Sequence, residues 1–362
     1  MHIKKNGRIK LPISNKYFKS YKKIAVIGAG WFGCHIAYQL IKKNYSVKIY
    51  EERNDIFCGA SGNNQNRLHL GFHYPRSLIT RTQSKFGFNN YIKEYPNLSK
   101  KIKNNIYAIA SDTKNITDFG SYVQIMKSSN LKFKLVNPKK YKLFNVEGAL
   151  SCKERMINFE KAKIFFKNKL YRNLVLNCEI KKIEKQKKKY VINNSSYDFV
   201  INCTWQQLKG FSNWDFNYEA CLTFLYKPKF KNLPSITIMD GPFYTLYEWN
   251  KEFFNLYSVK DSKLITTKNL VLAKKKIAQL DTKKKFLLRK KIEHGFKKFF
   301  PEFKKKFKFY SYLKTLKTLQ NLQTHNRNVQ VQENNKFIDV LSGKIDHIAI
   351  ASKEVLKCIK KY

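Results

Sequence analysis

A short polar stretch of this 362-residue chain gathers side chains that could do chemistry. It reads GASGNNQNRLHLGFHYPRS, covers Gly59 to Ser77, and has neither the period of a helix nor that of a strand. His69 and His73 within it could carry protons, because the imidazole pKa lies close to neutral pH. A histidine held structurally in a polar loop is at least as common, so both interpretations stay open. No carboxylate or cysteine accompanies the pair at a metal-binding spacing, and we predict no metal site.

Arginine and tyrosine side chains could hold the substrate of such a site. Arg67, Arg76 and Arg327 could each bind a carboxylate or phosphate through two parallel hydrogen bonds. Tyr74 and Tyr244 could place hydroxyl groups in a pocket. Ion pairs and core packing are the ordinary alternatives for these residue types. Our candidate catalytic set is His69, Tyr74 and Arg327.

The segment KIAVIGAGWFGCHIAYQLIKKNYSVKIYEER, which begins at Lys23, has the pattern of a nucleotide-binding turn. An apolar strand at 24–27 leads into the turn, an amphipathic helix follows to about Lys42, and a second strand covers 47–50. The first glycine allows the tight turn, the second lets the backbone approach a pyrophosphate, and the third lets the helix pack closely on the strand. Free N–H groups at the start of the helix would then face the phosphates. The glycines of this turn are Gly28, Gly30 and Gly33.

Acidic residues at the end of the second strand could bind the ribose of the nucleotide. Glu51 follows the last glycine at about the spacing at which such folds place a ribose-binding acid, and Glu52 is its competitor. Trp31 and Phe32 stand between the second and third glycines and belong to the same predicted binding segment. A glycine turn without a ligand is the alternative, which the flanking strands and the acid make the weaker one.

Basic side chains are unusually abundant, because 72 lysines and arginines against 25 aspartates and glutamates give a formal charge of +47. Such a charge is typical of proteins that bind nucleic acid or anionic membranes. The lysines are scattered along the whole chain together with many Asn, Ile, Phe and Tyr, so we interpret most of them as a solvated surface. Seven cysteines without a C-x-x-C pair indicate a reducing compartment, and we expect a cytoplasmic protein. Residues 1–22 are interpreted as a basic leader.

The polar stretch after the second strand favours FAD over NAD. A nicotinamide dehydrogenase would usually continue with another crossover helix and strand, and RNDIFCGASGNNQNRLHLGFHYPRS has no such pattern. At this point the chain resembles the D-amino-acid-oxidase superfamily of FAD-dependent oxidoreductases. Residues 61–77 are most similar to the loop S/T-G-x-N-S-x-x-x-H-x-G-x-x-Y of 2-hydroxyglutarate and glycerol-3-phosphate dehydrogenases, which follows the pyrophosphate and ribityl chain to the flavin ring. The resemblance implies that His69 lies close to the ring and that FAD is contacted by Ser61, Asn64 and Gln65.

Later segments resemble the same family. An apolar strand at 199–202 ends in Cys203-Thr204-Trp205, where the family has an Ala-Thr-Gly turn beside FAD, and the resemblance implies that Thr204 contacts the cofactor. Near the end, KFIDVLSGKIDHIAIASKEVLKCI reads as strand, turn and helix and resembles the terminal motif of the family. Gly343 and Lys344 are thereby implied to lie against the flavin, where the helix dipole and the lysine would stabilise negative charge.

These segments predict an α/β fold, with a Rossmann-type FAD-binding domain and an inserted antiparallel α+β substrate domain. Alternating, aromatic-rich segments between about 218 and 270 are typical of an antiparallel sheet. The predicted FAD-binding domain is discontinuous and comprises 23–110, 150–215 and 320–362. The predicted substrate domain comprises 111–149 and 216–319.

The predicted function is that of an FAD-dependent oxidoreductase. The C–H bond next to an amine or hydroxyl of a small, acidic substrate would give a hydride to flavin N5, and oxygen or another acceptor would reoxidise the flavin. We expect no transmembrane segment and leave contact with a membrane surface open. Two alternatives remain: a basic RNA-modifying flavoprotein, and a non-catalytic FAD-binding scaffold suggested by the altered turns at 203–205 and 342–346.

Overall fold

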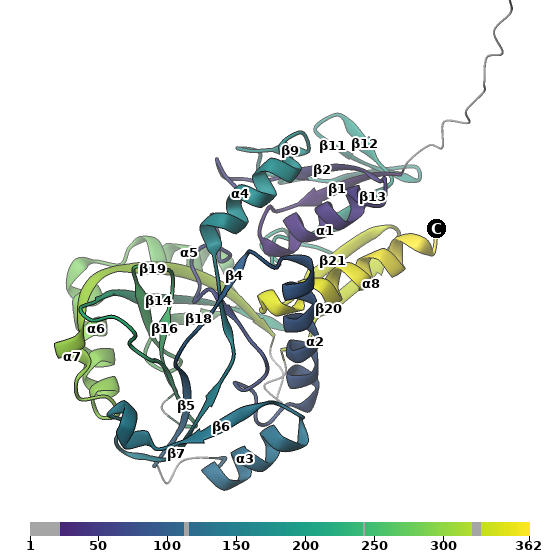
Figure 1. The fold of residues 1–362 in the computed structure, drawn as a ribbon. Coiled ribbons are helices and arrows are strands. Elements are labelled where there is room, and N and C mark those ends of the chain that lie inside the picture. The colour runs from purple at the N-terminus through teal and green to yellow at the C-terminus, as the bar shows by residue number, and fades with distance from the viewer. Residues whose placement is uncertain (1–21, 112–115, 242, 321–326) are drawn as a thin grey trace, which may run out of the picture.

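The computed structural model describes residues 22–111, 116–241, 243–320 and 327–362, so the basic leader predicted for residues 1–22 lies outside the described part, except for Lys22. Figure 1 shows two β-sheets, one above the other in this view, each with helices of its own. The chain crosses between the sheets more than once, because strands from both ends of the sequence meet in the upper one. This is the α/β architecture that the sequence predicts.

The first sheet contains the predicted nucleotide-binding turn. In spatial order its strands are β20 (Gln330–Asn334), β21 (Phe337–Leu341), β13 (Phe199–Asn202), β1 (Lys23–Ile27), β2 (Ser46–Tyr50) and β9 (Leu174–Val175). Pairing is parallel from β21 to β9, and β20 returns antiparallel to β21. The carboxyl ends of β1, β2 and β13 therefore meet at one edge, which is where open parallel sheets bind their ligands.

Both faces of the first sheet are covered, which explains why its central strands are almost wholly apolar. On β1, Ile24 and Val26 point toward helices, whereas Ala25 and Ile27 point toward a small sheet on the other face. The helices packed on this domain are α1 (Trp31–Ile41), α2 (Leu78–Glu94), α4 (Phe159–Leu170) and α8 (Ile348–Lys360). The small sheet consists of β10 (Glu184–Gln186), β11 (Lys189–Ile192) and β12 (Ser195–Tyr197).

The second sheet is mostly antiparallel, as predicted for the inserted part. In spatial order its strands are β18 (Lys263–Thr267), β14 (Phe216–Pro228), β17 (Phe254–Ser258), β16 (Tyr244–Glu248), β15 (Ser235–Met239), β5 (Asn105–Ala110), β7 (Val146–Cys152) and β6 (Phe133–Val136), with β19 (Phe307–Gln320) also paired to β14. Along β14, Leu222 and Phe224 enter an apolar core, and Glu219 and Thr223 lie on the opposite face. Around β14 the opposite face is therefore polar although it is buried, whereas Tyr107, Ile109 and Leu150 make it apolar farther along the sheet.

Helices close the apolar face of the second sheet. Ile292, Phe296 and Phe303 of two of them pack into the core that contains Leu222 and Phe224. Local sequence sets where several of these helices begin, because Asp118, Asn269 and Asp281 each accept a backbone N–H of the first turn. The elements beside this sheet are the 3₁₀ turn η1 (Pro138–Tyr141), α5 (Leu270–Ala278), α6 (Thr282–Lys297), α7 (Phe303–Lys306) and α3 (Phe119–Ser128), of which α3 packs on the opposite face.

The first domain boundary differs from the predicted one. We placed residues up to 110 in the FAD-binding domain, but β5 pairs with β7 and β15 and is an internal strand of the second sheet. A strand with buried residues on both faces has the same sequence pattern in either sheet, so the pattern could not assign it. A further small sheet, β3 (Arg67–Leu68), β8 (Arg155–Ile157) and β4 (Ser99–Lys101), links the two parts.

The apolar segment 24–41 forms a strand, a glycine turn and a helix, as predicted from its glycines. Its helix α1 has 11 residues. A helix that spans a bilayer needs about 20 residues, because each residue adds about 1.5 Å. Within the described ranges, no helix combines the length and apolar character needed to cross a membrane.

A buried histidine ties three helical segments of the first domain together. His35 of α1 has Nδ1 at 2.6 Å from the Tyr95 hydroxyl and Nε2 at 3.1 Å from the Ser352 hydroxyl. Burial lowers the pKa of His35 from 6.5 to about 4. The folded protein therefore holds this imidazole neutral in a pH range where the unfolded chain protonates it.

We expect this difference to weaken the protein in mild acid. Between the unfolded and folded pKa values, only the unfolded chain takes up a proton as the pH falls, so the free energy of unfolding decreases by about 3 kcal/mol from pH 6.5 to 4. Urea denaturation at several pH values, with saturating FAD, measures the slope. His35→Gln should have a lower free energy of unfolding than the wild type at neutral pH, but this free energy should fall less when the pH is lowered. Equal decreases in the variant and the wild type would exclude His35 as the source of the pH dependence.

Candidate functional site

The glycine turn after β1 has the geometry that the fingerprint predicts. Gly28 adopts a left-handed φ of +94° and donates its N–H to the Tyr50 carbonyl at 2.7 Å, which ties the turn to β2. A Cβ on Gly33 would lie 1.9 Å from the Gly28 carbonyl oxygen, so α1 can pack this closely only with glycine there. The start of α1 is consequently held against the carboxyl edge of the first sheet.

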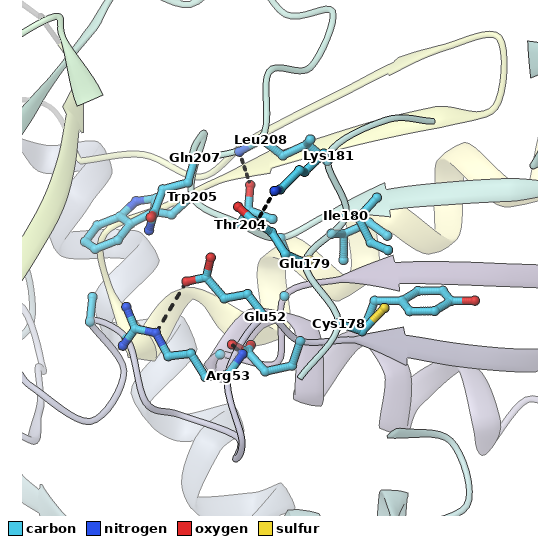
Figure 2. A pocket seen from close by; sticks show the side chains of 18 of the residues that line it. Glu52, Arg53, Cys178, Glu179, Ile180, Lys181, Thr204, Trp205, Gln207 and Leu208 are labelled. Atoms are coloured by element: carbon cyan, nitrogen blue, oxygen red, sulfur yellow. Dashed lines mark hydrogen bonds and ion pairs between the residues drawn. The ribbon is translucent and has the colours of Figure 1, made fainter. Parts of the chain in front are cut away.

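Glu51, at the end of β2, is part of the same turn. Its carboxylate accepts the Ala29 N–H at 2.7 Å and the Arg53 N–H at 3.1 Å, and burial raises its pKa. Glu52 instead forms an ion pair with Arg53 at 3.3 Å (Figure 2). Of the two acids considered for the ribose, Glu51 is the one that the backbone of the turn fixes in place.

A cavity of about 430 Å³ opens at this edge of the sheet. Its size is that of an ordinary cofactor or ligand pocket. Figure 2 shows side chains of the 52–53, 178–181 and 204–208 segments around it. Predicted residues that line the cavity are Gly28, Gly30, Glu51, Glu52, Ser61 and Thr204.

The loop that follows β2 is held mainly by its own amides. Ser61 Oγ accepts the Trp31 N–H at 3.0 Å, and the Asn64 amide donates to the carbonyls of Ala60 and Ser61 at 2.9 and 2.7 Å. Gln65 reaches the second sheet, where Nε2 donates to Asn255 Oδ1 at 3.0 Å. Asn64 and Gln65 thus shape the loop with side-chain groups that we had expected to contact FAD.

Two aromatic residues of the predicted binding segment lie against the core. The Trp31 indole is 1% exposed and stacks on Phe57 at 4.7 Å between ring centroids. Phe32 packs against the same cluster and is partly buried. Neither residue lines the cavity, because the first turn of α1 directs both side chains toward the core.

Thr204 begins the turn after β13. Its hydroxyl donates to Asn202 Oδ1 at 2.7 Å and accepts the Leu208 N–H at 2.9 Å, so the side chain organises the turn as well as lining the cavity. Trp205 comes next, and its ring is 3.8 Å from the position of a Cβ on Gly343. The segments that resemble the family's two later FAD motifs are therefore neighbours in space.

Three residues of the polar loop and one of the terminal turn form a cluster that is buried at His69 and half-buried elsewhere; we call it the histidine cluster: His69, His73, Tyr74 and Lys344. The two imidazole rings are 5.1 Å apart, and His69 lies 5.9 Å from the Tyr74 ring. Lys344 Nζ is 3.4 Å from His69 Nε2 and 4.6 Å from the centre of the Tyr74 ring. The polar loop and the terminal turn thus meet at the histidine that the resemblance placed beside the flavin.

Burial and positive charge keep the histidines of this cluster neutral. Burial lowers the pKa of His69 well below its ordinary value, and the charges of Lys344 and Arg67 lower it further. Burial likewise lowers the pKa of Lys344 to about 8. Within the described part of the chain, buried His69 Nδ1, His73 Nδ1 and Tyr74 Oη have no hydrogen-bond partner. The cluster can therefore accept protons and hydrogen bonds from a bound molecule.

A buried carboxylate that the sequence analysis missed supports the cluster. Glu154 is fully buried and accepts from Arg67 Nε at 2.9 Å, from the Tyr107 hydroxyl at 2.9 Å and from the Leu70 N–H at 2.8 Å. Its other side faces His69, with 3.8 Å between Oε1 and Nδ1. A single acid in the basic segment between β7 and β8 was the only sequence signal for it.

The three candidate arginines have different surroundings. Arg67 is paired with Glu154, and Arg76 forms an ion pair with Asp240. Arg327 is the exception: burial lowers its pKa, and the carboxylate that acts on it, Glu219, already faces two lysines. Arg327 also adds to the positive potential at His73, and its backbone N–H donates to Thr80 Oγ1 at 3.3 Å.

Tyr244, the other candidate pocket hydroxyl, belongs to the core. Its ring lies 6.0 Å from both Phe296 and Phe299, and only 6% of the residue is exposed. Core packing, the alternative considered for Tyr244, therefore describes its position, because Tyr244 is on the face of β16 that the helices cover.

Among the described residues no group of three side chains is suited to binding a metal ion.

The residues present fit a dinucleotide that carries a flavin. Gly30 has no Cβ at the mouth of the cavity, where one would approach Ser61 Oγ at 2.9 Å, so the backbone lies open to a phosphate. Farther along the polar loop, the unpartnered groups of the histidine cluster offer hydrogen bonds to a ring system. Fold and site together define a two-domain, dinucleotide-binding flavoprotein.

Comparison with known proteins assigns the family. The family model described as DAO, FAD dependent oxidoreductase, matches residues 23–210. Over 361 residues the chain is 31% identical to the FAD-dependent monooxygenase FPY4 of Fusarium mangiferae, with 98% of this chain and 95% of that protein covered. The chain belongs to the DAO family of FAD-dependent oxidoreductases, and its cofactor is FAD.

Solved structures show the same fold. The dithionite-reduced L-α-glycerophosphate oxidase of Mycoplasma pneumoniae with FAD bound has a TM-score of 0.74 at 13% identity, covering 94% of this chain and 95% of that one. Glycine oxidase from Geobacillus kaustophilus has a TM-score of 0.70 at 10% identity, with the same coverage. The family, fold class and cofactor predicted from the sequence are thus confirmed.

Proposed function

We propose that the protein oxidises a C–H bond next to an amine or hydroxyl of a small, acidic molecule. The histidine cluster carries this proposal, because it combines a neutral imidazole with unpartnered polar atoms where the loop meets the terminal turn. Bound FAD supplies the acceptor for the hydride. The residues of the chain have to align the substrate and accept the proton that its amine or hydroxyl loses.

His69 is the proposed proton acceptor. A charged Lys344 donates toward Nε2, so the neutral imidazole carries its own proton on Nδ1, which faces Glu154. Lys344 would have to release Nε2 before this nitrogen takes a proton from the substrate, and the imidazolium that then forms would be stabilised by the Glu154 carboxylate. Glu154 is accordingly a positioning residue, held in turn by Arg67 and Tyr107. Tyr74 would add a hydroxyl hydrogen bond to the substrate.

Arg327 is the proposed partner of the substrate's anionic group. Glu219 is 2% exposed and lies 3.0 Å from Lys263 and 3.6 Å from Lys317, so one buried carboxylate faces two lysines in addition to Arg327. Lys263 is exposed to solvent, but Lys317 and Arg327 are more deeply placed, and an anionic ligand would balance their charge. An acidic substrate therefore fits better than a neutral or cationic one.

FAD would extend from the cavity to the histidine cluster. The backbone of the glycine turn would approach the pyrophosphate and Glu51 would accept from the ribose. The polar face of the second sheet would close the substrate chamber, which makes the first sheet the FAD-binding domain and the second the substrate domain. The proposed FAD-contacting residues are Gly28, Gly30, Gly33, Glu51, Ser61, Thr204, Gly343 and Lys344.

A monooxygenase reaction is the second candidate, because the full-length relative is named a monooxygenase. Mixing the protein with candidate substrates in the absence of oxygen distinguishes the two reactions. Under our proposal, amino acids or 2-hydroxy acids bleach the bound flavin without NADH or NADPH, whereas their amides and esters do so far less. Flavin that only a reduced nicotinamide can bleach, with a product that gains oxygen from O₂, would establish the monooxygenase reaction instead.

The Arg327→Ala variant tests the acidic substrate. We expect the substrate concentration for half-maximal flavin reduction to rise by about thirtyfold or more, since a buried charge loses its partner, while the limiting rate changes little. Arg172, an exposed arginine stacked on Tyr171, provides the control Arg172→Ala. Rapid-mixing kinetics on FAD-replete proteins measure both constants; an unchanged half-saturation in Arg327→Ala would remove the arginine from the substrate site.

A further inference from the structure

The charges around the cofactor cavity do not balance. Glu52 is paired with Arg53 at 3.3 Å, and Glu179 with Lys181 at 3.4 Å. Glu51 is committed to two backbone N–H groups of the turn. These carboxylates are therefore engaged by neighbours that also line the cavity, as Figure 2 shows for the first two pairs.

Two lysines that line the cavity have no such partner. Lys209 follows the turn after β13, and Lys274 belongs to α5 of the second domain. Neither side chain makes a hydrogen bond or ion pair with any residue in the described ranges. A diphosphate carries two negative charges at neutral pH, which is the charge that two unpaired ammonium groups complement.

The position of Lys274 is fixed by the helix that bears it. The preceding residue, Ala273, is fully buried and anchors α5 on β14, β18 and β19. Asn269 caps the start of the helix by accepting the Leu272 N–H at 3.0 Å. Lys274 and Lys275 are both exposed, but of the two only Lys274 lines the cavity. Of the two adjacent lysines, Lys274 is thus the one that lines the same cavity as Gly28 and Gly30.

We propose that Lys274, assisted by Lys209, binds the diphosphate of FAD from the side opposite the glycine turn. The turn offers backbone N–H groups from the first domain, and Lys274 adds a mobile positive charge from the second. Because α5 packs on the second sheet, this contact makes the cofactor a bridge between the two domains. Lys274 is then a cofactor-binding residue that no feature of the glycine fingerprint reveals.

Titration of the FAD-free protein tests this proposal, with quenching of flavin fluorescence as the readout and ADP and adenosine as competing ligands. We expect Lys274→Ala to weaken FAD and ADP by about two- to fivefold, the effect of one exposed charge pair, and to leave adenosine unchanged. Lys274→Glu should weaken both further, and Lys274→Arg should restore them. The loss should shrink as salt is added, because salt screens an exposed charge.

Lys275→Ala is the matched control, since it removes the same charge one position along the same helix. Equal FAD affinities of Lys274→Ala and Lys275→Ala would overturn the proposal. So would an equal loss for adenosine, because the lysine would then act on the nucleoside or on the fold. The titration needs no substrate, so its outcome is independent of the proposed oxidation.

Discussion

Replacing His69 by alanine should slow substrate-driven reduction of the flavin by roughly a hundredfold, the usual scale for loss of a positioned acid or base. Bound FAD should be retained, because the glycine turn and the cavity lie elsewhere. The physical reason is that His69 is a buried, neutral imidazole whose pKa is held low by its surroundings. Anaerobic rapid mixing measures the reduction rate, and absorbance of the purified protein measures the flavin content.

A purely structural histidine would give a different pattern. Added imidazole should restore part of the rate in His69→Ala, which no repair of packing would achieve. His294, exposed on α6, supplies the control variant His294→Ala, which should behave as the wild type. A His69→Ala protein that reduces its flavin at the wild-type rate would falsify the assignment of His69 as the proton acceptor.

The second large effect concerns the glycine turn. Gly30→Val should lower the affinity for FAD by about a hundredfold or more, since its side chain would begin 2.9 Å from Ser61 Oγ and occupy the approach of the pyrophosphate. Gly30→Ala should fall between valine and the wild type. Flavin content after purification and titration of the FAD-free protein give the affinity.

Gly120 at the start of α3 serves as control for this series. A Cβ there would meet only Asp118 Oδ1, at 3.2 Å, so Gly120→Ala should bind FAD normally. Full flavin occupancy in Gly30→Val would show that the turn does not hold the pyrophosphate and would move the cofactor to another part of the fold.

Local spacing explains why the turn was predicted correctly. Gly28, Gly30, Gly33 and Glu51 lie within one strand–helix–strand unit, where the required geometry leaves its mark on neighbouring residues. His69 also stands inside a recognisable loop, and its place beside the flavin stays a prediction. Where a structural feature depends on a short stretch of sequence, the pattern of that stretch is sufficient to predict the feature.

Contacts between distant segments could not be predicted in this way. Glu154 reaches His69 through the pairing of β3 with β8, and Glu219 faces Lys317 because β14 pairs with β19. Isolated acids in lysine-rich segments look alike whether they are exposed or buried. Lys274 likewise stands among similar lysines, and the packing of α5 alone directs it toward the cavity.

Side-chain direction accounts for the differences within the predicted binding segment. Trp31 is adjacent to the glycine turn in sequence, yet the helical geometry of α1 carries its indole into the core beside Phe57. Asn64 and Gln65 belong to the recognised loop but hydrogen-bond to the loop itself and to Asn255. A motif locates the backbone of a site more reliably than the groups that contact the ligand.

A crystal structure of the FAD-loaded protein tests most directly whether the polar loop brings the flavin to the histidine cluster. We predict that the adenosine lies beside Glu51 in the cavity, that Lys274 approaches the diphosphate, and that the isoalloxazine ring contacts His69, Tyr74 and Lys344. An isoalloxazine ring that lies away from His69, with the histidine cluster closed on itself in the presence of FAD, would contradict this arrangement and with it the proposed oxidation.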